Sequence, residues 1–136
     1  MASRLNPYLS FTDTAREAME FYRSVFGGEL SVSSYGDFGH AEGEGEDLVM
    51  HAQLETPQGF TLMGADMPPG MGMQPSAGVW ISLSGDDQEL RGWFSALAEG
   101  GTVHNDLAVQ VWGDEFGQLV DRFGIGWMVN IARPPE

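Results

Sequence analysis

Hydrophobic and polar residues alternate in short stretches along the whole chain, and such alternation predicts half-buried strands. In the first half the stretches lie at residues 5–11, 29–35, 48–55 and 60–63. In the second half they lie at residues 79–84, 102–103, 107–112, 115–121 and 125–131. Within 48–55, the alternation predicts Val49, His51 and Gln53 on the side away from the apolar residues. This pattern indicates sheets with one buried side.

Two segments instead repeat their apolar residues every three or four positions, which predicts one amphipathic helix in each half. These segments lie at residues 15–26 and 90–98. A capping-box pattern, Thr14 to Glu17, is expected to begin the first helix, and Gly-Gly pairs at 27–28 and 100–101 are expected to end both. The helix follows the first strand of each half.

The order strand, helix, strand, strand, strand therefore occurs twice, and this predicts an α+β fold of two tandem βαβββ modules. We expect one domain over residues 1–136, built of module 1–66 and module 77–136. A connector rich in Pro, Gly and Met joins them at 67–76. The acidic, Gly-rich segment 39–47 is expected to be a solvated loop, because its spacing does not match a calcium loop.

Composition and charge exclude several classes of protein. Apolar residues make up 42% of the 136, enough for a core. Six arginines and no lysine oppose 20 acidic residues, so the net charge is −14 and neither nucleic acid nor an anionic membrane is an expected partner. Cysteine is absent, and no basic-then-apolar leader or membrane-length apolar run occurs. We expect a cytoplasmic protein.

Several segments, taken in order, resemble one family. They are Asn6–Phe11, Phe21–Gly28, Met50–Leu54, Leu62–Asp66, Trp112–Gly117 and Asp121–Trp127. In sequence and spacing they are similar to the vicinal oxygen chelate superfamily of glyoxalase, bleomycin-resistance and dioxygenase proteins, and most of all to its PhnB-like branch. The resemblance implies that the two modules form a U-shaped, eight-stranded mixed sheet around a cavity, commonly in a homodimer.

In metal-dependent members of that superfamily, His and Glu ligands come from the first and last strands of each module. The matching positions here are Asn6, Met63, Gly78 and Met128. Divalent catalytic metals prefer imidazole and carboxylate ligands, so we expect no metal cofactor. The alternative is one divalent ion held at a rearranged site around His51 and Asp66.

Polar and aromatic residues opposite the apolar stripes are candidates to contact a small-molecule ligand. They are Tyr8, His51, Gln53, Met63, Asp66, Trp80, Ser82, Trp112, Met128 and Asn130. A mixture of aromatic surface, Met and hydrogen-bonding groups suits a small, partly apolar ligand, although the same residues could simply fill the interior. His40 and His104 are expected in exposed loops.

Three functions are consistent with these residues. The first is a metal-free binding protein that sequesters or carries a small molecule of cationic or aromatic character, since the negative field of the protein attracts cations. The second is a metal-dependent lyase, isomerase or dioxygenase with the rearranged site. The third is a cofactor-free enzyme with His51, the best catalytic candidate, as general base.

Overall fold

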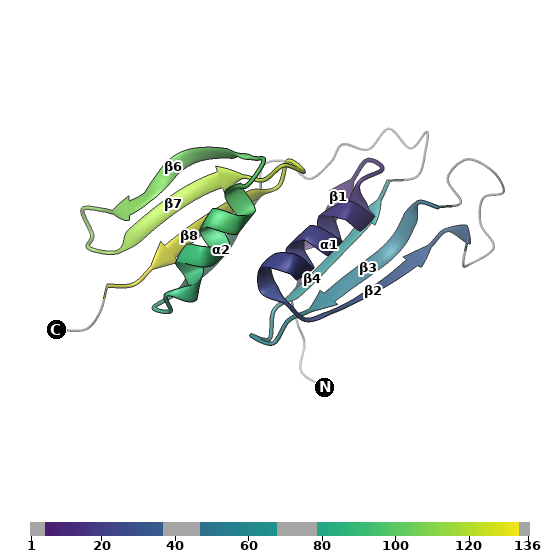
Figure 1. Cartoon of the computed structure of the whole chain (residues 1–136), viewed down its shortest axis with the longest axis horizontal. Helices are drawn as coiled ribbons and strands as arrows, with labels where there is room; N and C mark the ends of the chain where they lie inside the picture. The colour runs from purple at the N-terminus through teal and green to yellow at the C-terminus, as the bar shows by residue number, and fades with distance from the viewer. Residues whose placement is uncertain (1–4, 37–46, 68–78, 134–136) are drawn as a thin grey trace. The chain divides into compact units, whose positions relative to one another are not determined.

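A computed structural model of the protein describes residues 5–36, 47–67 and 79–133 (Figure 1). The chain divides into two compact units, Met1–Ala77 and Gly78–Glu136. Of the predicted connector at 67–76, only Met67 belongs to the described residues, and most of the predicted acidic loop lies outside them.

Unit 1 is a four-stranded sheet with one helix. Its elements are β1 (Tyr8–Phe11), α1 (Ala15–Phe26), β2 (Glu29–Ser34), β3 (Val49–Glu55) and β4 (Thr61–Asp66). The strand order is β1-β4-β3-β2, in which β1 runs parallel to β4 and the other neighbours are antiparallel.

Unit 2 repeats this plan, which confirms the predicted pair of βαβββ modules. Its elements are β5 (Trp80–Gly85), α2 (Glu89–Ala98), β6 (Thr102–Val109), β7 (Glu115–Val120) and β8 (Gly126–Ile131). The order β5-β8-β7-β6 is the order of unit 1 over again, with β5 parallel to β8.

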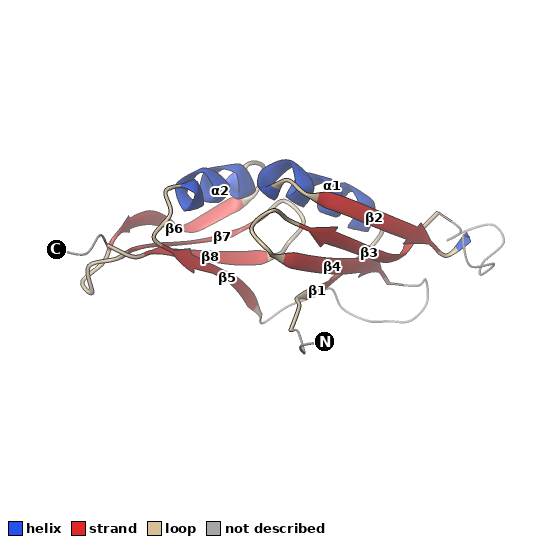
Figure 2. Ribbon diagram, turned by 90° about the horizontal axis from the view of Figure 1, so that it is seen from below, coloured by secondary structure: helices blue, strands red, loops and turns tan. Residues whose placement is uncertain are grey.

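The helix of each unit covers one face of that unit's sheet (Figure 2). In unit 1, Met19 and Tyr22 of α1 are buried together with Ala52 and Leu54 of β3. The largest fully buried side chain of unit 2 is Trp127 on β8. Neither described helix has the length and apolar character needed to cross a membrane.

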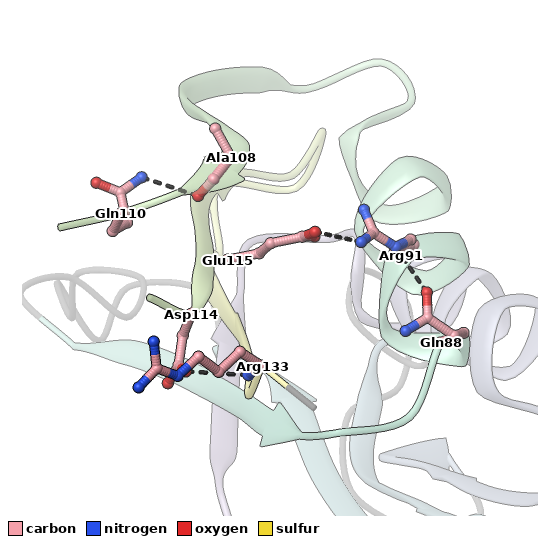
Figure 3. Close-up of polar contacts among 7 residues, drawn as sticks. All are labelled: Gln88, Arg91, Ala108, Gln110, Asp114, Glu115 and Arg133. Atoms are coloured by element: carbon pink, nitrogen blue, oxygen red, sulfur yellow. Dashed lines mark hydrogen bonds and ion pairs between the residues drawn. The ribbon is translucent and has the colours of Figure 1, made fainter. Parts of the chain in front are cut away.

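An ion pair also ties α2 to its sheet, where Arg91 donates to Glu115 of β7 (Figure 3). Gln88 accepts a second hydrogen bond from the Arg91 Nε at 2.8 Å. This pair lies on the helix-covered side of the sheet. The opposite side of each sheet is called the helix-free face below.

The predicted alternation fails at two places, in β6 and at the start of β3, and a β-bulge is the cause at both. The segments predicted at 102–103 and 107–112 are a single strand, β6, which ends before Trp112 and shifts register twice along β7. The pairing of β2 with β3 shifts between Ser33 and Ser34, and Val49 is buried rather than exposed beside His51. Each bulge inserts a residue and so reverses the alternation beyond it.

The predicted capping box at the start of α1 is wrong. Thr14 stands at the N-cap position, but its side chain makes no capping hydrogen bond. Instead the Asp66 Oδ1 accepts a hydrogen bond from the Ala15 backbone N–H at 2.9 Å. The cap comes from the last strand of the unit, 51 residues away along the chain.

Candidate functional site

A row of side chains crosses the helix-free face of unit 1 from one edge strand to the other. Tyr8 of β1 pairs with Met63 of β4, Met63 pairs with Gln53 of β3, and Gln53 pairs with Ser31 of β2. Residues directly opposite on neighbouring strands point to the same side of a sheet. The structure thus brings together three residues that the sequence predicted as ligand contacts.

A chain of hydrogen bonds starts at Tyr8 and continues along β3 on the same face. The Tyr8 hydroxyl lies 3.1 Å from His51 Nδ1, and His51 Nε2 lies 3.4 Å from Gln53 Oε1. Gln53 Nε2 in turn donates to Glu55 Oε1 at 2.8 Å. Glu55 Oε1 also accepts from the Thr61 hydroxyl at 2.9 Å.

Glu55, the last member of this series of hydrogen bonds, determines which group donates in each of them. An ionised carboxylate only accepts, so Gln53 presents its amide nitrogen to Glu55 and its oxygen to His51. The proton of a neutral His51 therefore sits on Nε2, and Nδ1 accepts from the Tyr8 hydroxyl. Both ring nitrogens of His51 are engaged by protein groups.

Tyr8 and Glu55 are the exposed members of this hydrogen-bond chain, and Tyr8 adds an aromatic ring. The Tyr8 side chain is 49% exposed, and its ring lies 5.6 Å from the His51 ring between centroids. Partial burial raises the pKa of the Tyr8 phenol above its ordinary value, and Tyr35 raises it further. The hydroxyl consequently keeps the proton that it donates to His51.

The helix-free face of unit 2 carries a corresponding row. Ser82 of β5 pairs with Met128 of β8, Met128 pairs with Gln118 of β7, and Gln118 pairs with Asn105 of β6. Ser82 and Met128 were predicted as ligand contacts, whereas Gln118 and Asn105 were not. The internal repeat could have identified Gln118, because Gln118 and Met128 have the same spacing as Gln53 and Met63.

Trp80 lies against the backbone of this same face. A side-chain carbon at Gly126, the residue opposite Trp80, would lie only 2.7 Å from the indole ring. The ring of His104 meets the indole edge-on, with 6.1 Å between centroids. His104 is exposed as predicted, but it belongs to strand β6 and not to a loop.

The two remaining predicted residues of unit 2, Trp112 and Asn130, are also close together. Trp112 follows β6, and its Nε1 lies 3.5 Å from Asn130 Oδ1. Asn130 Nδ2 donates to Asp114 at 3.0 Å. The Arg133 backbone N–H donates to the same carboxylate at 3.1 Å (Figure 3). These hydrogen bonds, that of Asn130 first, lower the pKa of Asp114.

Asp66 does not join the other predicted residues. Its side chain is buried, with 4% of the residue exposed, on the helix-covered side of the sheet. Its two oxygens accept from the Ala15 and Val49 backbone N–H groups, each at 2.9 Å. The carboxylate is therefore occupied in holding α1 and β3, and the proposed pairing of Asp66 with His51 at a metal is not formed.

The described residues do not offer a divalent metal a suitable set of ligands. No three of their His, Asp and Glu side chains gather at one place. At the family's ligand positions stand Asn6, Met63 and Met128, while Gly78 lies outside the described part. Thioethers favour soft metals such as Cu(I), and imidazole or carboxylate suits Zn, Fe and Mn.

Comparison with known proteins gives the same family over nearly the whole chain. Residues 4–129 match the model of the Glyoxalase/Bleomycin resistance protein/Dioxygenase superfamily. The chain is 25% identical over 142 residues to protein YjdN of Escherichia coli, with 95% of each chain covered. The structure of protein PA1353 from Pseudomonas aeruginosa is similar with a TM-score of 0.87 and 36% identity, covering 98% of this chain and all of that one.

A PhnB protein from Bacillus cereus is a further structural relative. It has 26% identity and a TM-score of 0.76, and the match covers 96% of this chain and 100% of the other. The tandem βαβββ units and the matched sequence point to the same family. The chain belongs to the Glyoxalase/Bleomycin resistance protein/Dioxygenase superfamily, with PhnB-like relatives.

Proposed function

We propose that the protein binds a small, partly apolar molecule on its helix-free faces and that it does so without a catalytic metal. The observation that carries the proposal is the hydrogen-bond chain from Tyr8 through His51 and Gln53 to Glu55. It fixes the orientation of polar groups on an accessible sheet face, beside the aromatic ring of Tyr8 and the thioether of Met63. Binding sites combine apolar surface with a few such fixed polar groups.

Charge restricts the class of ligand. The described arginines of unit 1, Arg16 and Arg23, both belong to α1 and not to the strands of the helix-free face. An anionic ligand on that face would therefore lose hydration without gaining a cationic partner. With a net charge of −14, the protein favours neutral or cationic ligands.

We propose no metal because the candidate ligand side chains are either already hydrogen-bonded or of the wrong chemical type. A metal at His51 would have to displace either Tyr8 or Gln53 from a ring nitrogen. Asp66, the second candidate ligand, is held on the other side of the sheet. Met63 and Met128 add thioethers, which hard divalent ions bind poorly.

A cofactor-free enzyme is the second candidate, and the Tyr8–His51 hydrogen bond favours it specifically. The Tyr8 oxygen could accept a proton from a substrate while its own proton passes to His51 Nδ1. His51 would then be a cation stabilised by the Gln53 oxygen. The metal-dependent enzyme has no comparable observation in its favour.

Native mass spectrometry of protein purified without chelators tests the proposal. We expect a co-purified organic mass and no stoichiometric metal, and we expect the organic mass to diminish in His51→Ala. That substitution removes two hydrogen bonds from the chain, so ligand affinity should fall by roughly tenfold. Gln58→Ala, in the turn before β4, is the control and should retain the ligand.

Other results would decide against the proposal. One divalent ion per chain, lost in His51→Ala but present in Gln58→Ala, would establish the metal-dependent alternative. Conversion of the co-purified compound by the wild type but not by His51→Ala, with binding retained, would establish the cofactor-free enzyme.

A further inference from the structure

We propose that Gln118, oriented by Asn105, gives the helix-free face of unit 2 a hydrogen-bond donor for the carbonyl oxygen of a flat, uncharged ring. This inference rests on the proposed function, because it names the chemical class of ligand that one of the two faces recognises. Neither residue was among the predicted ligand contacts.

The hydrogen bond between the two side chains determines what Gln118 presents. Asn105 Nδ2 donates to Gln118 Oε1 at 2.6 Å, so the carbonyl oxygen of Gln118 already has a donor. The amide nitrogen of Gln118 then lies on the other branch of the same planar group. Within residues 79–133, no acceptor is seen for that nitrogen.

The equivalent glutamine of unit 1 is used differently. Gln53 accepts from His51 and donates to Glu55, so both ends of its amide have protein partners. The repeat thus places the same residue type in the same row of each sheet, with its donor engaged in unit 1 and presented in unit 2.

Met128 and Trp80 supply apolar side chains on the face that carries Gln118. Met128 is directly opposite Gln118 on β8, and Ser82 follows on β5. Trp80, on the same edge strand, lies over Gly126 and remains 38% exposed. An aromatic ring that stacks on the indole gains dispersion energy, and a carbonyl on that ring can accept from Gln118.

The charges of unit 2 favour an uncharged acceptor over a carboxylate. The described arginines of this unit are Arg91 on α2, Arg122 in the turn after β7, and Arg133 beyond β8. None of the strand residues in the row is cationic. A carboxylate that accepts from Gln118 would have no cationic residue of the row to pair with, whereas a ketone, lactone or amide carbonyl needs none.

Three probes of similar size separate these possibilities: coumarin, which has a ring carbonyl, naphthalene, which has none, and 2-naphthoate, which is an anion. Dissociation constants are measured for the full chain by ligand-observed NMR titration. We expect wild-type protein to bind coumarin roughly three- to tenfold more tightly than naphthalene, the effect of one net hydrogen bond. Binding of 2-naphthoate should be the weakest of the three.

The variants then assign the preference to Gln118. Gln118→Glu keeps the shape of the side chain and its bond from Asn105 but loses the amide donor, so the preference for coumarin should disappear. Asn105→Ala should reduce the same preference by releasing the Gln118 amide. Gln88→Leu, on the helix side of the unit, is the control and should leave it unchanged, and near-UV circular dichroism verifies that each variant is folded.

Equal binding of coumarin and naphthalene to the wild type, no binding of coumarin, or an unchanged preference in folded Gln118→Glu would each overturn the inference. The co-purified mass in the native spectrum reports separately on the proposed function. If that mass is present and depends on His51 while the coumarin preference is absent, the inference fails and the proposed function stands.

Discussion

Asp66 shows how much one buried side chain can contribute to a small sheet. Its carboxylate accepts from Ala15 at the start of α1 and from Val49 at the start of β3. A buried charge is stable only where hydrogen bonds replace its hydration, and both of its oxygens have them. The residue therefore joins three elements of unit 1 at one point.

Replacement of Asp66 should destabilise the protein strongly. In Asp66→Ala, the two buried N–H groups lose their acceptor, and we expect the free energy of unfolding to fall by about 2–4 kcal/mol. Chemical denaturation monitored by circular dichroism measures this change. Asp47→Ala, at an exposed position of the same unit, should change the stability by less than about 0.5 kcal/mol. Equal effects of the two substitutions would show that the Asp66 hydrogen bonds are unimportant.

The sequence allowed some of these residue positions to be predicted and not others. Strict alternation in β3 correctly placed His51 and Gln53 on one side of the sheet. Asp66 was misplaced because a carboxylate near a strand end resembles a ligand, and only the three-dimensional fold shows the N–H groups that it accepts from. The apolar stripes do not distinguish Gln118 from its neighbours, whereas the repeat does, because Gln118 and Met128 have the spacing of Gln53 and Met63.

At the scale of elements, Gly101 and Gly92 of unit 2 have opposite effects on stability. A side-chain carbon at Gly101, where β6 begins, would overlap the Val120 carbonyl oxygen and approach the Asp121 Cα within 2.8 Å. A side-chain carbon at Gly92 in α2 would meet nothing within 4 Å. One glycine permits two strands to pair, and the other only weakens a helix.

Alanine at these two positions should therefore change stability in opposite directions. We expect Gly101→Ala to lower the free energy of unfolding by about 1–3 kcal/mol, because backbone must move to relieve the overlap. Gly92→Ala should raise it by about 0.5–1 kcal/mol through the higher helix propensity of Ala. Thermal or urea denaturation of the pair provides the measurement. A destabilised Gly92→Ala would contradict the open surroundings of that position.

Most elements could be predicted from periodicity alone, since both helices and the strands of each unit follow simple periods of 3.6 and 2. The failures occur where the backbone departs from those periods. At the bulges of β3 and β6 an inserted residue reverses the alternation, and no side-chain pattern marks the insertion. The first turn of α1 has the composition of a capping box, but a tertiary contact supplies its cap.

At the scale of the molecule, the family leads us to expect a homodimer. Exposed apolar side chains such as Val109 and Val111, 69% and 102% exposed, are consistent with association. We expect sedimentation equilibrium at micromolar concentration to give twice the 14.8 kDa chain mass. A monomer over the whole concentration range would contradict this expectation. The high net charge should make the dimer more stable as salt screens the repulsion between chains.

The source of the α1 cap also determines when this helix can be completed during folding. Asp66 belongs to the last strand of unit 1, so the Ala15 N–H obtains its acceptor only after β4 has docked beside β1. In unit 2 the corresponding position is Ile131, and the first turn of α2 is closed locally by Asp87, whose Oδ1 accepts from the Glu89 N–H at 3.0 Å. Local contacts form earlier than contacts that close a long loop. The two halves of the repeat share a topology, yet we expect the first turn of α2 to form before its sheet is complete and that of α1 only afterwards.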